Sequence, residues 1–187
     1  HPAWACAVAD PGGAGDAHRT VQETLERHGR LDVLVNNAGA GAILPLADAT
    51  AERIREIFDI NVVGPSLLAR AALPHHKPSR GHIGRVSSTF GHKAAAALSH
   101  YAGSKAALEL MTKCWALEFA PDGIRVNAIA AGPTDTDFLT ERMQLSEAQA
   151  EAFWRIRDSI SEAERAEGPT FAHDISRVVE RCELIAL

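Results

Sequence analysis

Short apolar segments flank a long helical one in HIGRVS (residues 82–87), SHYAGSKAALELMTKCWALEF (99–119) and IRVNAIA (124–130). The two short segments have the length and apolar content of strands, and the long segment predicts a helix with Ser99 as its N-cap. The residues Pro121-Asp122-Gly123 form the turn between this helix and the next strand. A strand, a helix and a strand in this order predict two parallel strands joined by a crossover helix.

The same alternation continues toward the N-terminus. The expected elements there are a strand at Ala3–Ala9, a helix from its cap Asp16 to Gly29, a strand at Leu31–Val35, and a helix from about Thr50 to Leu73 that Pro74 ends. The predicted fold class is therefore α/β, a doubly wound, Rossmann-like parallel sheet with helices on both faces. Residues 1–187 are expected to form a single domain, with 138–170 as a helical substrate lid. Surface packing or a subunit contact is the alternative for that segment.

Composition and charge exclude several classes of protein. The chain has 187 residues, 46% of them hydrophobic, and a net charge of −5, which indicates one soluble domain and argues against a nucleic-acid binder. No apolar run is long enough to predict a membrane span. The three cysteines, Cys6, Cys114 and Cys182, are too widely spaced for a metal motif or a disulfide framework, which suits the cytoplasm. The histidine pair His75-His76 has no carboxylate or thiol at ligand spacing, so no metal is predicted.

Tyr101 and Lys105 are the most informative residues of the chain. Because they are four residues apart, a helix places them one turn apart on the same face, where both can act on one substrate atom. For this pair alone, the alternative is an ordinary half-buried tyrosine beside a solvated lysine. Ser88, at the end of the preceding strand, adds a third polar side chain to the pattern.

Several short motifs, in one order, resemble the short-chain dehydrogenase/reductase family. They are Asn36-Asn37-Ala38-Gly39 after a strand, Asn61 in Asn-Val-Val-Gly, Ser88, Tyr101-x-x-x-Lys105 and the strand Ile124-Arg125-Val126-Asn127. The resemblance covers about Val8 to Phe138. It implies a Rossmann-type oxidoreductase, a ketoreductase that transfers a hydride between NAD or NADP and a small ketone or secondary alcohol.

The resemblance assigns the catalytic roles to Asn61, Ser88, Tyr101 and Lys105. A phenol ionises near pH 10, so Tyr101 needs the positive charge of Lys105 to act as a base, and Ser88 would hydrogen bond to the same substrate oxygen. In the family the lysine also binds the nicotinamide ribose, and the asparagine carbonyl holds a water that relays protons. Pro65 has no N–H to donate to the Asn61 carbonyl, which fits this water site; a plain helix kink is the alternative.

The resemblance also implies a set of cofactor-binding residues and an assembly. The cofactor-binding residues are Asp10, Asn36, Ala38, Gly39, Tyr101, Lys105, Gly132, Thr134 and Thr136. Turn formation is the alternative for Asp10 and for the loop 36–39. In the family the helices at Thr50–Leu73 and His100–Phe119 commonly pair across a dimer face, so a homodimer or homotetramer is expected.

The sequence departs from the family at the phosphate-binding loop. None of the 14 glycines builds TGxxxGxG or GxGxxG, so a major anchor for the pyrophosphate is missing. The sheet is therefore expected to be incomplete at both ends, because the chain is part of a longer polypeptide, because its sequence is incomplete, or because the sheet is rebuilt. Gly84 and Arg85 interrupt a strand that should be buried, so Gly84 is expected to leave a hole and Arg85 to need a cavity or a carboxylate partner.

Two other functions stay open. The missing phosphate loop favours a non-catalytic family member or fragment that acts as a binding or oligomerisation module, and binding of a nicotinamide cofactor distinguishes this module from the enzyme. A sugar-nucleotide epimerase or dehydratase shares Tyr-x-x-x-Lys, but the Asn-Asn-Ala-Gly motif and the short chain argue against it.

Overall fold

The structure is a computed structural model, and it describes residues 14–132, 146–148 and 151. Its helices and strands are α1 (Ala14–His28), β1 (Val33–Asn36), α2 (Ala51–Phe58), the π-helical turn η2 (Asp59–Val63), α3 (Gly64–Ser79), β2 (His82–Ser88), α4 (Ser99–Phe119) and β3 (Arg125–Ala131). Three short 3₁₀ turns join them: η1 (Leu46–Asp48), η3 (Thr89–Gly91) and η4 (Ala120–Asp122). The expected strand at Ala3–Ala9 and the expected lid at 138–170 lie outside the described residues, apart from 146–148 and 151.

The three strands form one parallel sheet in the order β1-β2-β3. Leu34, Ile83 and Val126 pair across it, as do Asn36, Arg85 and Ala128 one layer further along. The parallel order confirms the predicted α/β fold class. It also brings the carboxyl ends of β1, β2 and β3 to one edge, where the candidate site residues follow each strand.

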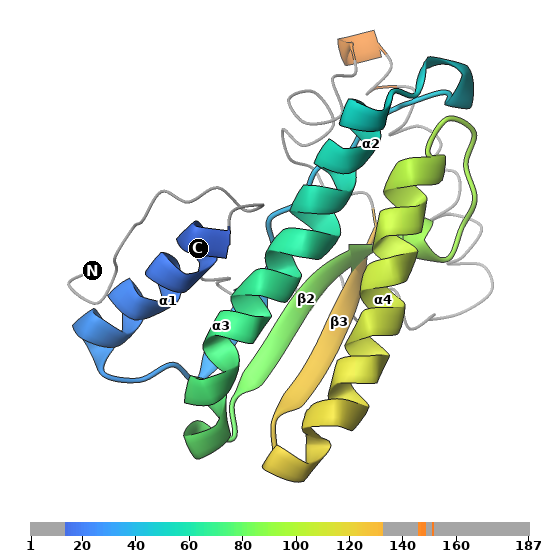
Figure 1. Cartoon of the computed structure of the whole chain (residues 1–187). Helices are drawn as coiled ribbons and strands as arrows, with labels where there is room; N and C mark the ends of the chain where they lie inside the picture. The colour runs from blue at the N-terminus through green and yellow to red at the C-terminus, as the bar shows by residue number, and fades with distance from the viewer. Residues whose placement is uncertain (1–13, 133–145, 149–150, 152–187) are drawn as a thin grey trace.

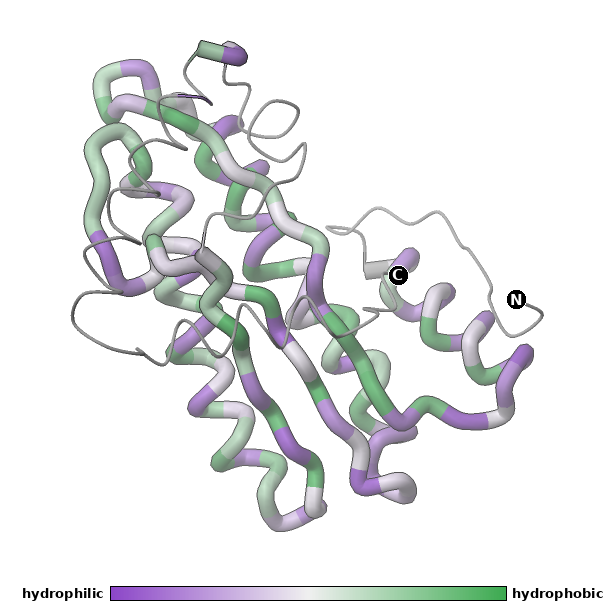
Figure 2. Tube along the Cα trace, turned by 180° about the vertical axis from the view of Figure 1, so that it is seen from behind, coloured by the Kyte–Doolittle hydropathy of each residue, from purple (hydrophilic) through white to green (hydrophobic). Residues whose placement is uncertain are grey.

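The hydrophobic core lies between the sheet and the helices α1, α3 and α4 (Figure 1). Its buried members are Val21, Leu31, Leu34, Ala69, Ala72, Ile83, Phe119, Ile124 and Val126. In the view from behind, the strands lie in front of these helices, so the described helices cover the other face of the sheet (Figure 2). Gly84 is half-buried, because its position in β2 alternates with the buried Ile83 and Arg85. Gly84 therefore lies on the face of the sheet that the described helices leave uncovered, and the hole predicted there stays a prediction.

The expected helix from Thr50 to Leu73 is interrupted at Asn61 and is longer than predicted. In the turn η2 the Gly64 N–H donates to the Asp59 carbonyl, five residues back, which widens the helix at the point where Pro65 cannot donate. The prediction that Pro74 ends the helix is wrong, since α3 continues to Ser79 with Pro74 inside it. Pro74 and Arg70, whose carbonyl would have accepted the missing bond, are both exposed, so water can replace that bond.

Two predicted N-caps are also wrong. Helix α4 begins one residue earlier than expected, because the Ala102 N–H donates to the Leu98 carbonyl at 2.8 Å, which makes Leu98 the cap. Helix α1 begins at Ala14, so Asp16 lies inside its first turn, where it forms an ion pair with Arg19 at 2.9 Å. An acidic residue there still stabilises the positive end of the helix dipole.

Candidate active site

The four predicted catalytic residues meet at the carboxyl edge of the sheet. Ser88 is the last residue of β2, Tyr101 and Lys105 are in the first turns of α4, and Asn61 is in the π-helical turn before α3. All four side chains are buried, with exposed fractions of 7% or less. The structure thus brings together residues that the sequence separates by as much as one helix, α3, and one strand, β2.

The Tyr101 phenol shares a hydrogen bond with the Ser88 hydroxyl. Ser88 is itself held in place, because its hydroxyl accepts a hydrogen bond from the Phe90 N–H at 3.3 Å, and the Phe90 ring packs edge-on against Tyr101. Burial raises the pKa of Tyr101 above its ordinary value of 10.0, and the hydrogen bond with Ser88 opposes that rise. Without a nearby cation this phenol therefore stays protonated at neutral pH.

Lys105 supplies the nearby cation. Its Nζ lies 5.9 Å from the centre of the Tyr101 ring and donates a hydrogen bond to the Val86 carbonyl at 3.0 Å. Burial lowers the pKa of Lys105 from 10.5 to about 8, and the positive charge of Arg85 contributes to this decrease. An ammonium group has three N–H donors, and only one of them has a partner among the described residues. The other two fit a ligand rich in hydroxyl groups.

Asn61 connects the loop after β1 to helix α4. Its side-chain amide accepts a hydrogen bond from the Ala40 N–H at 2.8 Å and donates to the Ala40 carbonyl at 2.8 Å and to the Ser104 hydroxyl at 2.9 Å. The Ser104 hydroxyl in turn donates to the Tyr101 carbonyl at 2.7 Å. Because its side chain is used in these contacts, Asn61 leaves its main-chain carbonyl as the group that can hold a ligand or a water.

Ser104 is a site residue that the sequence prediction missed. It is fully buried, and it joins Asn61 to the turn of α4 that carries Tyr101. Its position one residue before Lys105, and three after Tyr101, was the available signal. A serine inside a helix usually bonds to its own backbone or to water, so no local pattern links Ser104 to Asn61.

Of the predicted cofactor residues in loop 36–39, Gly39 lies beside Lys105. Gly39 packs closely there, since a Cβ at this position would lie 3.3 Å from the Lys105 Nζ and 3.4 Å from the Asn61 Oδ1. Asn36 is buried, and neither atom of its amide group has a hydrogen-bond partner among the described residues. Ala38 is exposed at this edge, as is Gly132 immediately after β3. Asp10, Thr134 and Thr136 lie outside the described residues.

A second polar cluster supports the segment that follows β2, and the sequence prediction missed it. The Ser87 hydroxyl donates to Glu109 Oε1 at 2.6 Å, and His92 Nε2 lies 2.9 Å from Glu109 Oε2. Gly91 packs directly against the Glu109 carboxylate. Because Glu109 is one turn after Lys105, this cluster fixes the Ser88–His92 segment against the helix that carries the catalytic pair.

No metal cluster or membrane helix is found in the part of the chain that the structure describes. Among residues 14–132, 146–148 and 151, no three His, Cys, Asp or Glu side chains gather as a metal site would need. Within the same residues, no helix has the length and apolar character to cross a bilayer. The prediction that the site uses no metal stays a prediction.

Known proteins share this sequence and this fold. The family described as short chain dehydrogenase matches residues 3–146. The chain is 36% identical over 163 residues to the short-chain dehydrogenase/reductase FrzI of Cladobotryum sp, covering 87% of this chain. Among solved structures, a 3-ketoacyl-(acyl-carrier-protein) reductase from Brucella melitensis complexed with NADH superposes with a TM-score of 0.69 at 32% identity over 73% of this chain. An NAD⁺-bound xylitol dehydrogenase superposes with a TM-score of 0.68 at 32% identity, also over 73%.

The chain is shorter than these relatives. It spans 62% of the length of FrzI, 59% of the Brucella reductase chain and 53% of the xylitol dehydrogenase chain. Within that span, the family match covers the strands β1, β2 and β3 and every described residue of the site. The chain therefore belongs to the short-chain dehydrogenase family and carries its Rossmann-type fold.

Proposed function

We propose that this protein is an NAD(P)-dependent oxidoreductase that interconverts a small ketone and the corresponding secondary alcohol. The observation that carries the proposal is the contact between the Tyr101 phenol and the Ser88 hydroxyl, with the Lys105 ammonium 5.9 Å from the centre of the phenol ring. Two hydroxyl groups converge on one point, and a buried cation lies next to them. This arrangement suits proton transfer to a carbonyl oxygen.

Tyr101 is the general acid in reduction and the general base in oxidation. In reduction the phenol donates its proton to the substrate oxygen as negative charge develops there, and Ser88 donates a second hydrogen bond to the same oxygen. In oxidation the phenolate accepts the proton of the alcohol. Burial raises the pKa of Tyr101, so the phenolate depends on the positive charge of Lys105 nearby.

Lys105, Asn61 and the loop 36–39 form the cofactor side of the proposed site. The bound nicotinamide supplies or accepts the hydride. Lys105 donates its two remaining N–H groups to ribose hydroxyls, while the Asn61 carbonyl holds the water through which Lys105 exchanges its proton with solvent. Loop 36–39, with Gly39 against Lys105, contributes the backbone and the Asn36 amide. Asp10, Gly132, Thr134 and Thr136 complete the proposed set of cofactor contacts.

The proposed assembly is a homodimer or homotetramer that pairs through α4. Leu110 and Leu117 support this proposal, because they are seven residues apart on α4 and expose 64% and 80% of their surfaces. Analytical ultracentrifugation should show a dimer or a tetramer at micromolar concentration. A monomer at that concentration would contradict the assembly without affecting the proposed chemistry.

The alternative is a non-catalytic member of the family that binds a partner or another copy of itself. It would be favoured if the protein has no glycine-rich phosphate loop, a motif that residues 1–187 do not contain. The two proposals differ in what Tyr101 does, because only the enzyme needs its hydroxyl group.

A Tyr101→Phe variant tests the proposed chemistry. We expect it to lower the rate of NAD(P)H oxidation with a panel of small ketones by roughly 10²–10⁴-fold, the usual contribution of a general acid. Cofactor affinity should stay within a few-fold of the wild type, since Lys105 is intact. The matched control is Phe90→Leu, which changes the ring beside Tyr101 and keeps its hydroxyl group. Equal turnover by wild type and Tyr101→Phe would contradict the catalytic role and leave the non-catalytic alternative.

A further inference from the structure

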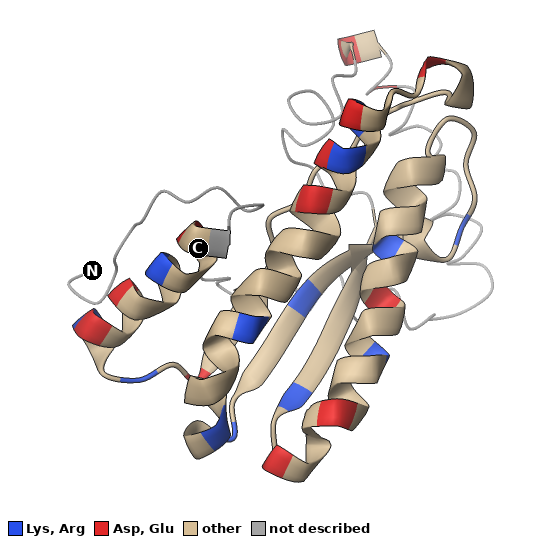
Figure 3. Cartoon of the chain, in the orientation of Figure 1, with Lys and Arg blue, Asp and Glu red and all other residues tan. Residues whose placement is uncertain are grey.

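Arg85 is a buried cation in the middle of the sheet, and the proposed chemistry has not used it. It lies on β2 between Asn36 of β1 and Ala128 of β3, and it is 1% exposed. Figure 3 shows it as the blue segment within β2. A charged side chain at such a position is costly, so the way its charge is balanced matters.

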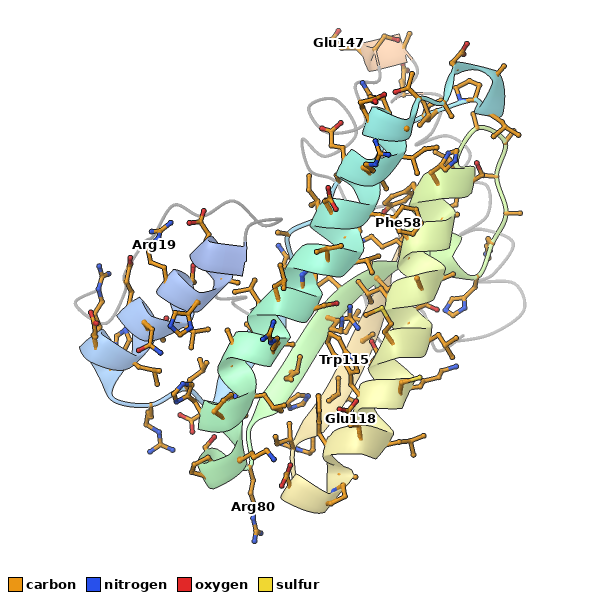
Figure 4. The ribbon with its side chains drawn as sticks, in the orientation of Figure 1. Arg19, Phe58, Arg80, Trp115, Glu118 and Glu147 are labelled. Carbon is orange, nitrogen blue, oxygen red and sulfur yellow. The ribbon has the colours of Figure 1, made fainter. Side chains whose placement is uncertain are left out.

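No carboxylate balances this charge among the described residues. The Arg85 Nη1 donates to the Leu108 carbonyl at 3.2 Å and to the Thr112 hydroxyl at 3.5 Å, and its guanidinium lies 4.3 Å from the centre of the Trp115 ring. Trp115 is labelled in Figure 4 on the side of α4 that faces the strands. The predicted carboxylate partner is therefore wrong for the part of the chain that the structure describes. These neutral partners stabilise the charge without cancelling it, so its field reaches other groups.

The electrostatic field of Arg85 acts on Lys105. Leu108, which accepts from Arg85, is three residues after Lys105 on the same face of α4, and Val86, which accepts from the Lys105 Nζ, is the residue after Arg85. Two cations are thus attached to neighbouring points of the same strand–helix contact. Neither forms an ion pair among the described residues, and both are buried, so water screens their repulsion only weakly.

The other charged groups around Lys105 do not offset Arg85. On α4 itself the nearest are Tyr101, protonated at neutral pH, and Glu109, whose carboxylate is bonded to Ser87 and His92. On α2 and η2, which also pack on α4, the side chains of Glu56 and Asp59 are exposed. Strand β3 presents only Arg125, and it is exposed too.

We propose that Arg85 is a positioning residue of this site: its buried positive charge, held on the Leu108 carbonyl next to the strand position that holds Lys105, acts on the Lys105 ammonium and favours transfer of its proton. Burial and Arg85 together lower the pKa of Lys105 to about 8, where an isolated lysine would keep its proton to 10.5. The consequence for catalysis rests on the proposed function, because a proton relay through Lys105 to Tyr101 needs a lysine that both holds and releases a proton in the working range.

The composition of the chain allows a test that uses neither cofactor nor substrate. The only lysines are Lys77, Lys93, Lys105 and Lys113, so isotope labelling confined to lysine gives four NMR signals, and a Lys105→Arg variant identifies the one that belongs to Lys105. The titration midpoint of this signal is measured in wild type, in Arg85→Met and in Arg85→Gln. Two neutral variants are used so that the test stands if one of them fails to fold, and Arg125→Met is the matched control for loss of an exposed arginine on the neighbouring strand.

We expect both neutral variants to raise the Lys105 midpoint by roughly one pH unit, while Arg125→Met leaves it unchanged. The direction is diagnostic, because more apolar surroundings alone would lower the midpoint further. An unchanged or lowered midpoint in a folded Arg85 variant would overturn the proposal. Since the measurement needs no turnover, a raised midpoint in a protein that proves inactive would keep the role of Arg85 and count against the proposed function alone.

Discussion

Replacement of Asn61 by alanine should destabilise the protein more than replacement of any exposed asparagine. The side chain is 1% exposed and makes three hydrogen bonds, two to Ala40 and one to Ser104, at 2.8, 2.8 and 2.9 Å. At about 1 kcal/mol net for each bond, the loss is about 3 kcal/mol in the free energy of unfolding. The bonds lost are those that hold the loop after β1 against helix α4, so the proposed cofactor site should loosen as well.

Urea unfolding, followed by circular dichroism, measures this loss. The matched control is Asn127→Ala, because Asn127 is exposed on β3 and its side chain makes a single contact, 2.9 Å from the His82 ring. We expect the control to change the free energy of unfolding by less than about 0.5 kcal/mol. If Asn61→Ala were no more destabilising than Asn127→Ala, the hydrogen bonds of Asn61 would not hold the loop after β1 against helix α4.

Two further predictions concern packing and pH. Gly91→Ala should lower the melting temperature by several degrees, because the added methyl group collides with the carboxylate of Glu109. The control is Gly103→Ala on α4, where the added methyl group has nothing within 4 Å, and thermal unfolding should give this variant an equal or higher melting temperature. Burial lowers the pKa of His76 below 6.5, so the unfolded chain takes up a proton there first as the pH falls. In urea titrations, the free energy of unfolding should therefore reach its full value above pH 6.5 and decrease below that pH. His76→Gln should make this decrease smaller. An equal decrease in wild type and His76→Gln would refute the role of His76.

The sequence predicted the parallel α/β fold from its local patterns, and it predicted the four central site residues from the resemblance to the short-chain dehydrogenase/reductase family. Apolar segments of strand length alternate with helices, and this order alone requires parallel strands whose carboxyl ends meet. The spacing of Tyr101 and Lys105 predicted that they share one face of a helix, and the family resemblance supplied their catalytic roles. The missing N–H group at Pro65 indicated a water site at the Asn61 carbonyl, with a helix kink as the alternative; the structure has a π-helical turn there, and the water site stays a prediction.

The helix ends, the proline inside α3 and the roles of Ser104 and Glu109 could not be predicted, because they depend on backbone geometry and on contacts distant in sequence. Ser99 and Asp16 are good capping residues, but α4 begins one residue earlier than predicted because the Leu98 carbonyl accepts the first helical bond, and Asp16 lies inside α1. Pro74 is tolerated inside α3 because it is exposed. Ser104 and Glu109 gain their roles from Asn61 and Ser87, more than twenty positions earlier, and no local pattern marks such pairs.

The most direct test of the proposed site is a titration of the protein with NADH and NADPH, followed by nicotinamide fluorescence, for wild type, Lys105→Met and Lys113→Met. Lys113 is an exposed lysine on the same helix, so its variant controls for the loss of one charge. The arrangement around Lys105 predicts that wild type and Lys113→Met bind at least one of the two cofactors with micromolar affinity and that Lys105→Met binds at least tenfold more weakly, by about 1.4 kcal/mol. No binding by wild type, or equal binding by Lys105→Met, would contradict the assignment of this edge of the sheet as a nicotinamide cofactor site.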